Sequence, residues 1–412
     1  MKFGIFYEHQ LPRPWEGGQE HKILHDALEQ IELADKLGYD TVWEVEHHFL
    51  EEYSHSSAPE VFLAAASQRT SNIRIAHGIV AALPGYNPPA RVAERIATLD
   101  LVSNGRVEFG TGETSSDMEL HGFGIDRASK RAMWEEAVGE ICRMMVEEPY
   151  LGHEGEFFNM PPRNVVPKPY QKPHPPVWVA CSKRDTILMA ADRGIGALSF
   201  AFIDPDEAKQ WTDDYYARFE ACSDPIGFDL NPNLAVVSGF MCHEDEQTAL
   251  DRGLDGFHFF AYSLSHYYMF GNHTPGKTNV WEEFEQNREA MGFAKLSAQG
   301  AELGATEQTE GGFSALRGCI GTPDQLRTLL RGYEDAGVDQ IIFIGQAGKN
   351  QHEHVCESLE LFAREVMPEF KEREAEHQKK KAERLAPVYE RLRGYNQPRG
   401  ETDIVVSANP VF

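Results

Sequence analysis

The most promising catalytic residues in this sequence are two adjacent histidines near the end of a strand-like segment. The run Asp40 to Phe49 reads DTVWEVEHHF, so a strand-like stretch ends in Glu46, His47 and His48. An imidazole titrates near neutral pH, which suits histidine to accepting and donating protons. Because successive side chains of a strand point to opposite faces, only one of the two histidines is expected to enter a cavity directly.

Three interpretations of this pair compete. Both histidines could be structural and bonded to loop backbone. A metal site would use one histidine with Glu44 or Glu46 and would need further ligands from other strand ends. His9 and His77 are candidates for those ligands, yet their spacing matches no known metal motif. We favour a histidine that acts on a substrate or orients it.

The elements that must position this pair follow a regular order. Short apolar, β-branched runs alternate with longer stretches in which apolar residues recur at helical spacing, which favours βαβ units and a parallel sheet. Eight such runs in one long chain predict a closed (β/α)8 TIM barrel, whose active site lies at the carboxyl ends of the strands. An open doubly wound sheet is the alternative, but the GxGxxG turn it requires is missing from FYEHQLPRPWEGG. The strand-like runs are 2–7, 41–46, 73–80, 107–110, 177–181, 197–202, 234–241 and 340–344, and helical patterns cover 23–37, 129–145, 323–336 and 354–366.

A barrel of this type takes roughly 250 residues, so insertions are expected. Residues 148–175 (EPYLGHEGEFFNMPP and a proline-rich return) predict a small hairpin excursion. Residues 255–317 combine aromatics (FHFFAYSLSHYYMF) with a polar, glycine-rich stretch (AQGAELGATEQTEGG), which indicates a lid or substrate wall, with a contact between subunits as the alternative. We therefore expect a barrel with these insertions over 1–370, and a charged helical extension and C-terminal arm over 371–412.

Composition excludes several classes of protein. The chain has 412 residues, with 39 Lys and Arg against 65 Asp and Glu, a formal charge of −26. Such acidity argues against nucleic-acid binding and against docking on anionic membranes. None of the six cysteines forms a CxxC pair, so neither a zinc ribbon nor a thioredoxin-like motif is supported, and scattered cysteines fit a reducing compartment. With no signal-peptide pattern at the N-terminus and no apolar run of membrane-spanning length, we expect a cytoplasmic protein.

Several motifs, in the same order along the chain, resemble the bacterial luciferase-like flavin-dependent monooxygenases. MKFGIFYEH and GYDTVWEVEHHF resemble the start of that family, and NIRIAHGIVAALPGYNPPARVAERIATLDLVSNGRVEFGTG is similar to its third and fourth βα units. VWVACSKRDTILMAADRGIGALSF resembles its phosphate-side strand and helix. IGTPDQLRTLLRGYEDAGVDQIIF with ESLELFAREVMPEF resembles its last unit. The resemblance runs from residue 1 to about 370.

The resemblance implies a barrel enzyme, paired as a homodimer, that uses molecular oxygen and reduced FMN from a separate flavin reductase. It implies a flavin C4a-peroxide intermediate and hydroxylation or Baeyer–Villiger oxidation of a small hydrophobic organic substrate. The family's catalytic histidine is the first of the EHH pair, here His47, which would hold or move a proton. Family members also place a non-proline cis peptide under the flavin ring, by position at Gly78-Ile79. Such a bond costs about 3–4 kcal/mol and would mark function.

A phosphate site is expected where a strand ends and a helix begins, because backbone N–H groups and a cation gather there. The segment Ala180-Cys181-Ser182-Lys183-Arg184-Asp185-Thr186 has this form, and Arg131 falls where the family has a phosphate-binding arginine. Alternatively, Arg131 pairs with Glu135 and Lys183 is a solvated cation, and Cys181 is interpreted as a buried small residue rather than a reactive thiol. The candidate flavin-binding residues are therefore Gly78, Ile79, Arg131, Ala180, Cys181, Ser182, Lys183 and Thr186, and no metal is expected.

Two carboxylates depart from the family pattern. Glu113, in GTGETSS, stands where many members have an arginine that contacts the flavin phosphate, which leaves room for a different flavin. A carboxylate beside a phosphate is unfavourable unless it is turned away or paired. Glu44 stands where members have a small or apolar residue, and it must be paired or face water. It could contact the substrate or equally pair with Arg74 or Arg106, and we assign it no role.

Three other functions remain as alternatives. A deazaflavin (F420)-dependent hydride-transfer enzyme of the same superfamily typically carries an Asp-His or Ser-Asp-His motif with a Trp a few residues on. Here the pair is followed by Phe49-Leu50-Glu51-Glu52 without a Trp, which favours FMN. A flavin-binding protein without catalysis and a metal-dependent barrel hydrolase are the other two.

Overall fold

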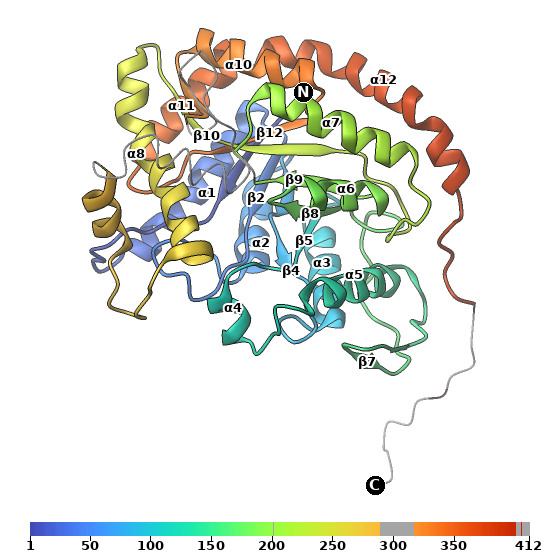
Figure 1. Cartoon of the computed structure of the whole chain (residues 1–412). Helices are drawn as coiled ribbons and strands as arrows, with labels where there is room; N and C mark the ends of the chain where they lie inside the picture. Colours follow the sequence, from blue (N-terminus) through green and yellow to red (C-terminus); the bar gives the residue numbers. More distant parts are fainter. Residues whose placement is uncertain (201, 289–316, 401–404, 406–412) are drawn as a thin grey trace.

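A closed barrel of eight parallel strands forms the centre of the protein and confirms the predicted (β/α)8 architecture (Figure 1). The computed structural model describes residues 1–200, 202–288, 317–400 and 405. The ring closes where the last strand pairs with the first, Gln340 opposite Lys2. In ring order the strands are β1 (Lys2–Tyr7), β2 (Thr41–Glu44), β3 (Arg74–His77), β5 (Val107–Gly112), β8 (Val177–Cys181), β9 (Gly196–Ser199), β10 (Leu234–Cys242) and β12 (Gln340–Ile344). Two short strands extend this sheet, β4 (Val80–Ala81) beside β5 and β11 (Cys319–Gly321) beside β10.

The strands are apolar on both faces because side chains fill the barrel and helices cover it. All nine residues of β10 (LAVVSGFMC) are buried. Close approach between two strands requires Gly110, since a Cβ there would lie 1.8 Å from the carbonyl oxygen of His77. The covering helices are α1 (Gln19–Leu37), α2 (Pro59–Arg69), α3 (Pro89–Val102), α5 (Lys130–Val146), α6 (Arg184–Asp192), α7 (Pro205–Glu220), α8 (Glu246–Ser265), α10 (Pro323–Ala336) and α11 (His352–Glu365).

Three of the predicted strands end earlier than expected, among them the run 197–202, which stops as β9 at Ser199. β2 stops at Glu44, so the Glu46-His47-His48 motif lies in the loop that follows it. The predicted run 73–80 divides into β3 and β4, with Gly78 and Ile79 between them. The expected cis bond at Gly78-Ile79 is wrong: every cis peptide bond among the described residues precedes a proline. The trans form is the ordinary state of a bond that does not involve proline.

The segments outside the regular units match the sequence patterns in part. An antiparallel hairpin, β6 (His153–Glu154) with β7 (Asn159–Met160), lies in the excursion expected at 148–175. The aromatic run 257–270 forms the end of α8 and a π-helix, η1 (His266–Phe270), whereas most of the glycine-rich stretch falls in 289–316, outside the described residues. The charged helix α12 (Met367–Leu392) runs along the outer edge of the molecule (Figure 1). Nearly all of the expected C-terminal arm is likewise not described.

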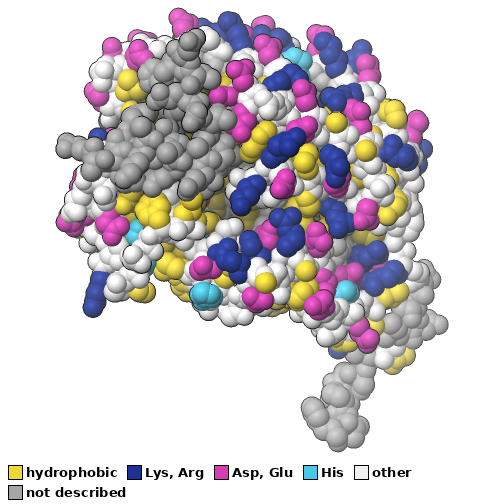
Figure 2. All heavy atoms as spheres, in the orientation of Figure 1, with side chains coloured by type: hydrophobic (Ala, Val, Ile, Leu, Met, Phe, Trp, Pro, Cys, Tyr) yellow, Lys and Arg dark blue, Asp and Glu magenta, His cyan; other side chains and the backbone are white. Residues whose placement is uncertain are grey.

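The surface is of mixed charge. Lys and Arg side chains are interspersed with Asp and Glu over the face shown in Figure 2. Of the helices described, none is long and apolar enough to cross a membrane.

Candidate active site

The imidazole of His47 lies between two carboxyl groups at the carboxyl end of the barrel. Its Nδ1 is 3.1 Å from Oε1 of Glu119, and its Nε2 is 3.8 Å from Oε2 of Glu8. The hydroxyl of Tyr268 lies 3.4 Å from the same Nε2. His48 takes a different partner, Glu46, at 3.3 Å. Of the two imidazole rings, it is therefore that of His47 that lies between Glu119 and Glu8, and 13% of its side chain is exposed.

Glu119, on the short helix α4 (Asp117–Gly122), organises the site from the far side of the ring. Besides His47, it accepts hydrogen bonds from the backbone N–H of His48 at 2.9 Å and from the hydroxyls of Tyr86 at 3.1 Å and Thr114 at 2.5 Å. Burial alone would raise the pKa of Glu119, but the His47 charge and these donors hold it below its usual range. Glu119 is thus an anion that fixes the orientation of the ring.

The surrounding acids decide the charge of His47. Burial lowers the pKa of an imidazole, but here Glu119, Glu8 and Glu46 outweigh burial and raise the pKa of His47 to about 9. At neutral pH the ring is an imidazolium, with Nδ1–H donated to Glu119 and Nε2–H directed toward Glu8. The site therefore holds a proton that it can donate.

This charge predicts a loss of stability at alkaline pH. Because folding raises the proton affinity of His47, the stabilisation is complete below pH 6.5 and is lost as the pH rises through about 9. We expect the free energy of unfolding to fall by about 3 kcal/mol over this window, which spans about 2.5 pH units at about 1.4 kcal/mol per unit for one proton. Urea titrations at several pH values measure the fall, which His47→Ala should abolish. An equal fall in both proteins would contradict the assigned charge.

Aromatic side chains from two parts of the chain surround the ring. Tyr53 and Tyr268 lie 5.5 Å and 6.2 Å from His47 between ring centroids, and Phe260 lies 5.6 Å from Tyr53. Tyr268 and Phe260 belong to the aromatic insertion, which therefore lines the site from η1 and α8. The hydroxyl of Tyr53 donates to Glu8 and that of Tyr268 faces Nε2 of His47, so both are polar points in this aromatic wall.

Glu44 has a different partner from those expected. Its Oε1 lies 2.8 Å from Nε2 of His9 and accepts a hydrogen bond from Ser56 at 2.6 Å. The pairing with Arg74 or Arg106 is wrong, because both arginines have other partners. Arg74 pairs with Glu108. Arg106 donates to the carbonyl oxygens of Ser67 and Ser103 and to the hydroxyl of Thr70. Both arginines come from the amino ends of their strands, whereas Glu44 ends β2, so the barrel separates them.

The other two histidines considered as ligands are not gathered around a common point. His9 binds Glu44 and Gln346, and His77 is buried with neither ring nitrogen hydrogen-bonded within the described chain. Burial lowers the pKa of His77 to about 4, which keeps the ring neutral. Over the residues that the structure describes, no group of three or more His, Cys, Asp or Glu is placed to hold a metal.

The expected phosphate segment has the predicted strand-to-helix form. β8 ends at Cys181 and α6 begins at Arg184, with no side chain capping its first turn. Ser182 and Lys183 are exposed, and Ala180 and Thr186 are partly buried. The Cys181 thiol is fully buried, which raises its pKa and makes it unreactive. Free N–H groups at this helix start fit an anion.

Arg131 has a carboxylate partner of its own. Its charge acts on the Cys181 thiol, and its Nη2 lies 2.6 Å from Oε1 of Glu113. Lys130 approaches the other oxygen of Glu113 at 3.5 Å. The alternative pairing of Arg131 with Glu135 is therefore wrong. Two cations and the α6 start fit a phosphate, and Glu113 competes with it for the cations.

This cation pair is linked to His47 through two residues, Thr114 and Glu119. Thr114, next to Glu113, has a left-handed backbone (φ 43°), which is strained for a β-branched residue. Its carbonyl oxygen accepts a hydrogen bond from Lys130 at 2.6 Å, and its hydroxyl binds Glu119. The strand β5 thus ends in a turn that connects the cations to the histidine. Sequence reasoning assigned no role to Glu8, Lys130 or Glu119, because their partners come from other strand ends.

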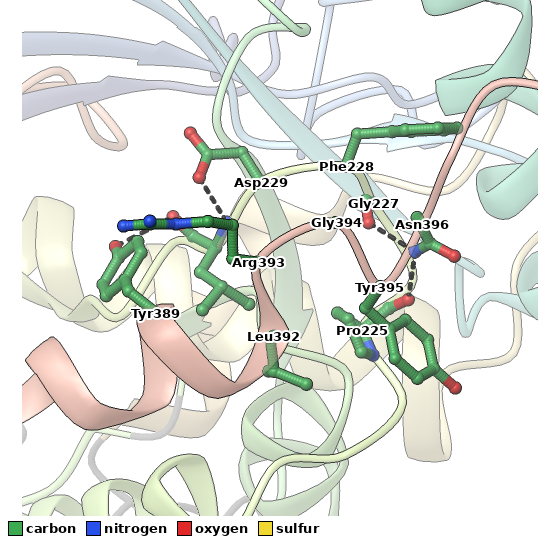
Figure 3. A pocket seen from close by; sticks show the side chains of 11 residues that line it. Pro225, Gly227, Phe228, Asp229, Tyr389, Leu392, Arg393, Gly394, Tyr395 and Asn396 are labelled. Carbon is green, nitrogen blue, oxygen red and sulfur yellow. Dashed lines mark hydrogen bonds between the residues drawn. The ribbon is translucent and has the colours of Figure 1, made fainter.

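A cavity lies at the opposite end of the barrel, between two segments of the chain that are hydrogen-bonded to each other. It encloses ≈ 270 Å³ between the end of α12 and the segment 225–230 that precedes β10 (Figure 3). Asn396 closes it by donating hydrogen bonds to the carbonyl oxygens of Pro225 at 2.7 Å and Gly227 at 2.6 Å. These hydrogen bonds hold the segment after α12 against the loop that precedes β10.

Known proteins share this combination of fold and motifs. Residues 1–340 match the family model described as luciferase-like monooxygenase. Two uncharacterised proteins of Sinorhizobium fredii are 31% and 34% identical over 42% and 47% of this chain. The matches cover 48% and 54% of those relatives, so the chain spans about half their length. The oxygenase component of flavin-dependent trigonelline monooxygenase from Acinetobacter baylyi is 24% identical over 90% of this chain and 96% of its own.

Solved structures agree on the architecture. Monooxygenase RslO1 from Streptomyces bottropensis matches with a TM-score of 0.69 and 25% identity, covering 90% of this chain and 100% of that one. A coenzyme F420-dependent tetrahydromethanopterin reductase from Methanopyrus kandleri matches with a TM-score of 0.62 and 19% identity, over 90% and 99% of the two chains. At that identity the second likeness shows the fold alone.

Proposed function

Because the chain belongs to the luciferase-like monooxygenase family, we propose that it is the oxygenase component of a two-component flavin monooxygenase. It would use reduced FMN and O2 to hydroxylate, or oxidise by Baeyer–Villiger insertion, a small hydrophobic organic substrate. A separate flavin reductase would supply the reduced FMN, as the name of the Acinetobacter relative supports. The observation that carries the proposal is the His47 ring, held between Glu119 and Glu8 at the carboxyl end of the barrel.

The residues present fit FMN. Arg131, Lys183, the hydroxyls of Ser182 and Thr186 and the free N–H groups of α6 would hold its phosphate. Gly78 and Ile79, with Ala180 and Cys181, would lie along the bound flavin. Reduced FMN supplies the two electrons and the reactivity toward O2.

Each protein group near the ring has a separate task. His47 holds one proton on Nε2 and presents it to the reacting oxygen. Glu119 keeps the ring oriented through Nδ1 and stabilises its positive charge. Tyr53, Tyr268 and Phe260 exclude water, which strengthens every electrostatic interaction in the site.

Arg131→Ala is expected to lower the affinity for reduced FMN about 10-fold or more, relative to its effect on the affinity for reduced riboflavin. The reason is that only FMN carries the phosphate that a guanidinium binds. Anaerobic titrations with both flavins measure the ratio. Glu113→Gln is the matched variant, because it removes the carboxylate that pairs with Arg131. It should raise the affinity for reduced FMN and leave the affinity for reduced riboflavin unchanged. Equal weakening of both flavins by Arg131→Ala would mean that Arg131 is structural.

An anaerobic binding titration with reduced FMN, and in parallel with reduced F420, tests the proposal. The FMN complex is then mixed with oxygenated buffer while absorbance and oxygen consumption are followed. Preferential binding of FMN, with oxygen consumed and organic product formed, supports the monooxygenase. Preference for F420 without oxygen consumption would replace it by hydride transfer. Tight binding of FMN without turnover of any organic compound would indicate a flavin-binding protein that has no catalytic activity.

We further propose a homodimer in the cytoplasm, with 1–370 as the barrel and 371–412 as an extension that begins in α12. Sedimentation of the purified protein tests the dimer, and the stability of a chain ending at residue 370 tests the boundary.

A further inference from the structure

Glu8 is a buried acid at the centre of the site. It directly follows β1 (Lys2–Tyr7), so it lies at the carboxyl end of the barrel, and it is 2% exposed. Its backbone carbonyl accepts hydrogen bonds from the hydroxyl of Ser54 at 2.9 Å and the N–H of His55 at 3.1 Å. The main chain therefore holds Glu8 firmly against the loop that follows His47.

The two oxygens of the Glu8 carboxyl differ. Oε1 accepts a hydrogen bond from the hydroxyl of Tyr53 at 2.9 Å. Oε2 is buried and has no hydrogen-bond partner within the described part of the chain. A buried carboxylate oxygen without a donor costs free energy, and such groups persist where they serve a purpose. The atom that faces this oxygen is Nε2 of His47, 3.8 Å away.

The opposite side of the ring fixes which nitrogen is available. Glu119 is an acceptor, so Nδ1 carries a proton whether the ring is charged or neutral. Nε2 is then the atom that gains and loses the second proton, and Oε2 of Glu8 is the carboxyl oxygen nearest to it. Tyr268, 3.4 Å from Nε2, can donate to the neutral ring.

We propose that Glu8 is a positioning residue whose carboxylate keeps the second proton of His47 on Nε2, an inference that rests on the proposed role of His47. Its Oε2 lies 3.8 Å from Nε2, which is too far for a hydrogen bond but close enough for a buried charge to act on the ring. The carboxylate favours the imidazolium over the neutral imidazole, because only the imidazolium balances its charge. Glu8 thus sets the pH at which Nε2 loses its proton.

The electrostatics of the two groups agree with this role. Burial raises the pKa of Glu8 to about 7, although the His47 charge and the Tyr53 hydroxyl oppose this. The value for His47 is about 9, so between these two pKa values Glu8 is a carboxylate while the His47 ring keeps its second proton. The titratable groups that face the pair are Glu44 at the end of β2, Glu46 and Tyr53 of the loop that follows it, Glu119 of α4 and Tyr268 of η1.

The test measures the titration of the His47 ring directly, by NMR of protein labelled at the histidine ring nitrogens and without flavin or substrate. His47→Ala identifies the signal among the 17 histidines. In Glu8→Gln the amide keeps the shape of the side chain but carries no charge. We expect the pKa of His47 to fall by at least 1 unit in this variant, and Glu8→Asp to restore part of the fall. The alkaline limb of the turnover profile should move in the same direction.

Tyr53→Phe serves as a second variant if Glu8→Gln fails to fold. It leaves the carboxyl in place but removes its donor, so Glu8 should hold its proton to higher pH and the pKa of His47 should fall more weakly. An unchanged His47 titration in a folded Glu8→Gln protein, or in Tyr53→Phe, would overturn the inference. Because this readout needs no turnover, it is independent of the function test. Full turnover by His47→Ala would refute the function and leave the titration result standing.

Discussion

His47→Ala is expected to lower turnover by about 10²–10⁴-fold, the range that a positioned proton donor contributes, while reduced FMN still binds. The ring touches no residue of the expected phosphate site, and its hydrogen bonds connect it to Glu119 and Tyr268. Removal therefore takes away the proton and leaves the flavin contacts. Product formation from a panel of apolar ketones and alkenes measures turnover, and an anaerobic titration measures binding.

The neighbouring His48 offers a matched control. Its ring bonds Glu46, which keeps its other donors, Asn87 at 2.8 Å and the Ala81 N–H at 3.0 Å. His48→Gln should therefore retain most of the wild-type turnover. Undiminished turnover in His47→Ala, or an equal loss in both variants, would remove the special role of His47.

Glu119→Ala is expected to lower the free energy of unfolding by about 3–5 kcal/mol, the cost of breaking a buried ion pair. Glu119 has no exposed side-chain surface and accepts from His47, His48, Tyr86 and Thr114. The variant leaves these donors without their acceptor and leaves a buried imidazolium without its nearest anion. The midpoint of urea unfolding at pH 7, with an unchanged slope, measures the loss.

Glu119→Gln separates the charge from the hydrogen bonds. The amide oxygen still accepts from the hydroxyls and the His48 N–H, so this variant should lose less stability than Glu119→Ala. It should nevertheless lower the pKa of His47, because the nearest negative charge is gone. A loss of less than about 1 kcal/mol in Glu119→Ala would mean that water or a rearranged loop satisfies the donors, and that Glu119 does not organise the site.

Much of the fold could be predicted from the sequence because local rules specify it. The helix expected over 323–336 is observed with the same bounds, since Thr322 and Gln325 form a capping box at its start and Gly337 adopts the left-handed conformation at its end. The expected strands at 2–7, 177–181 and 340–344 also keep their bounds. Alternating strands and helices then leave few closed arrangements, and the EHH motif after β2 falls at the carboxyl end of the barrel for that reason.

The sequence by itself therefore determined the barrel and the end at which His47 stands. Only the tertiary structure decided which charges meet there. Glu119 lies 72 residues after His47, and Glu44 pairs with His9 across two strand ends rather than with either arginine. Glu113 turned out to bind Arg131, not to stand beside an unpaired phosphate site. Backbone periodicity is local and readable along the chain, whereas the partner of a buried charge depends on which strand ends become neighbours when the ring closes.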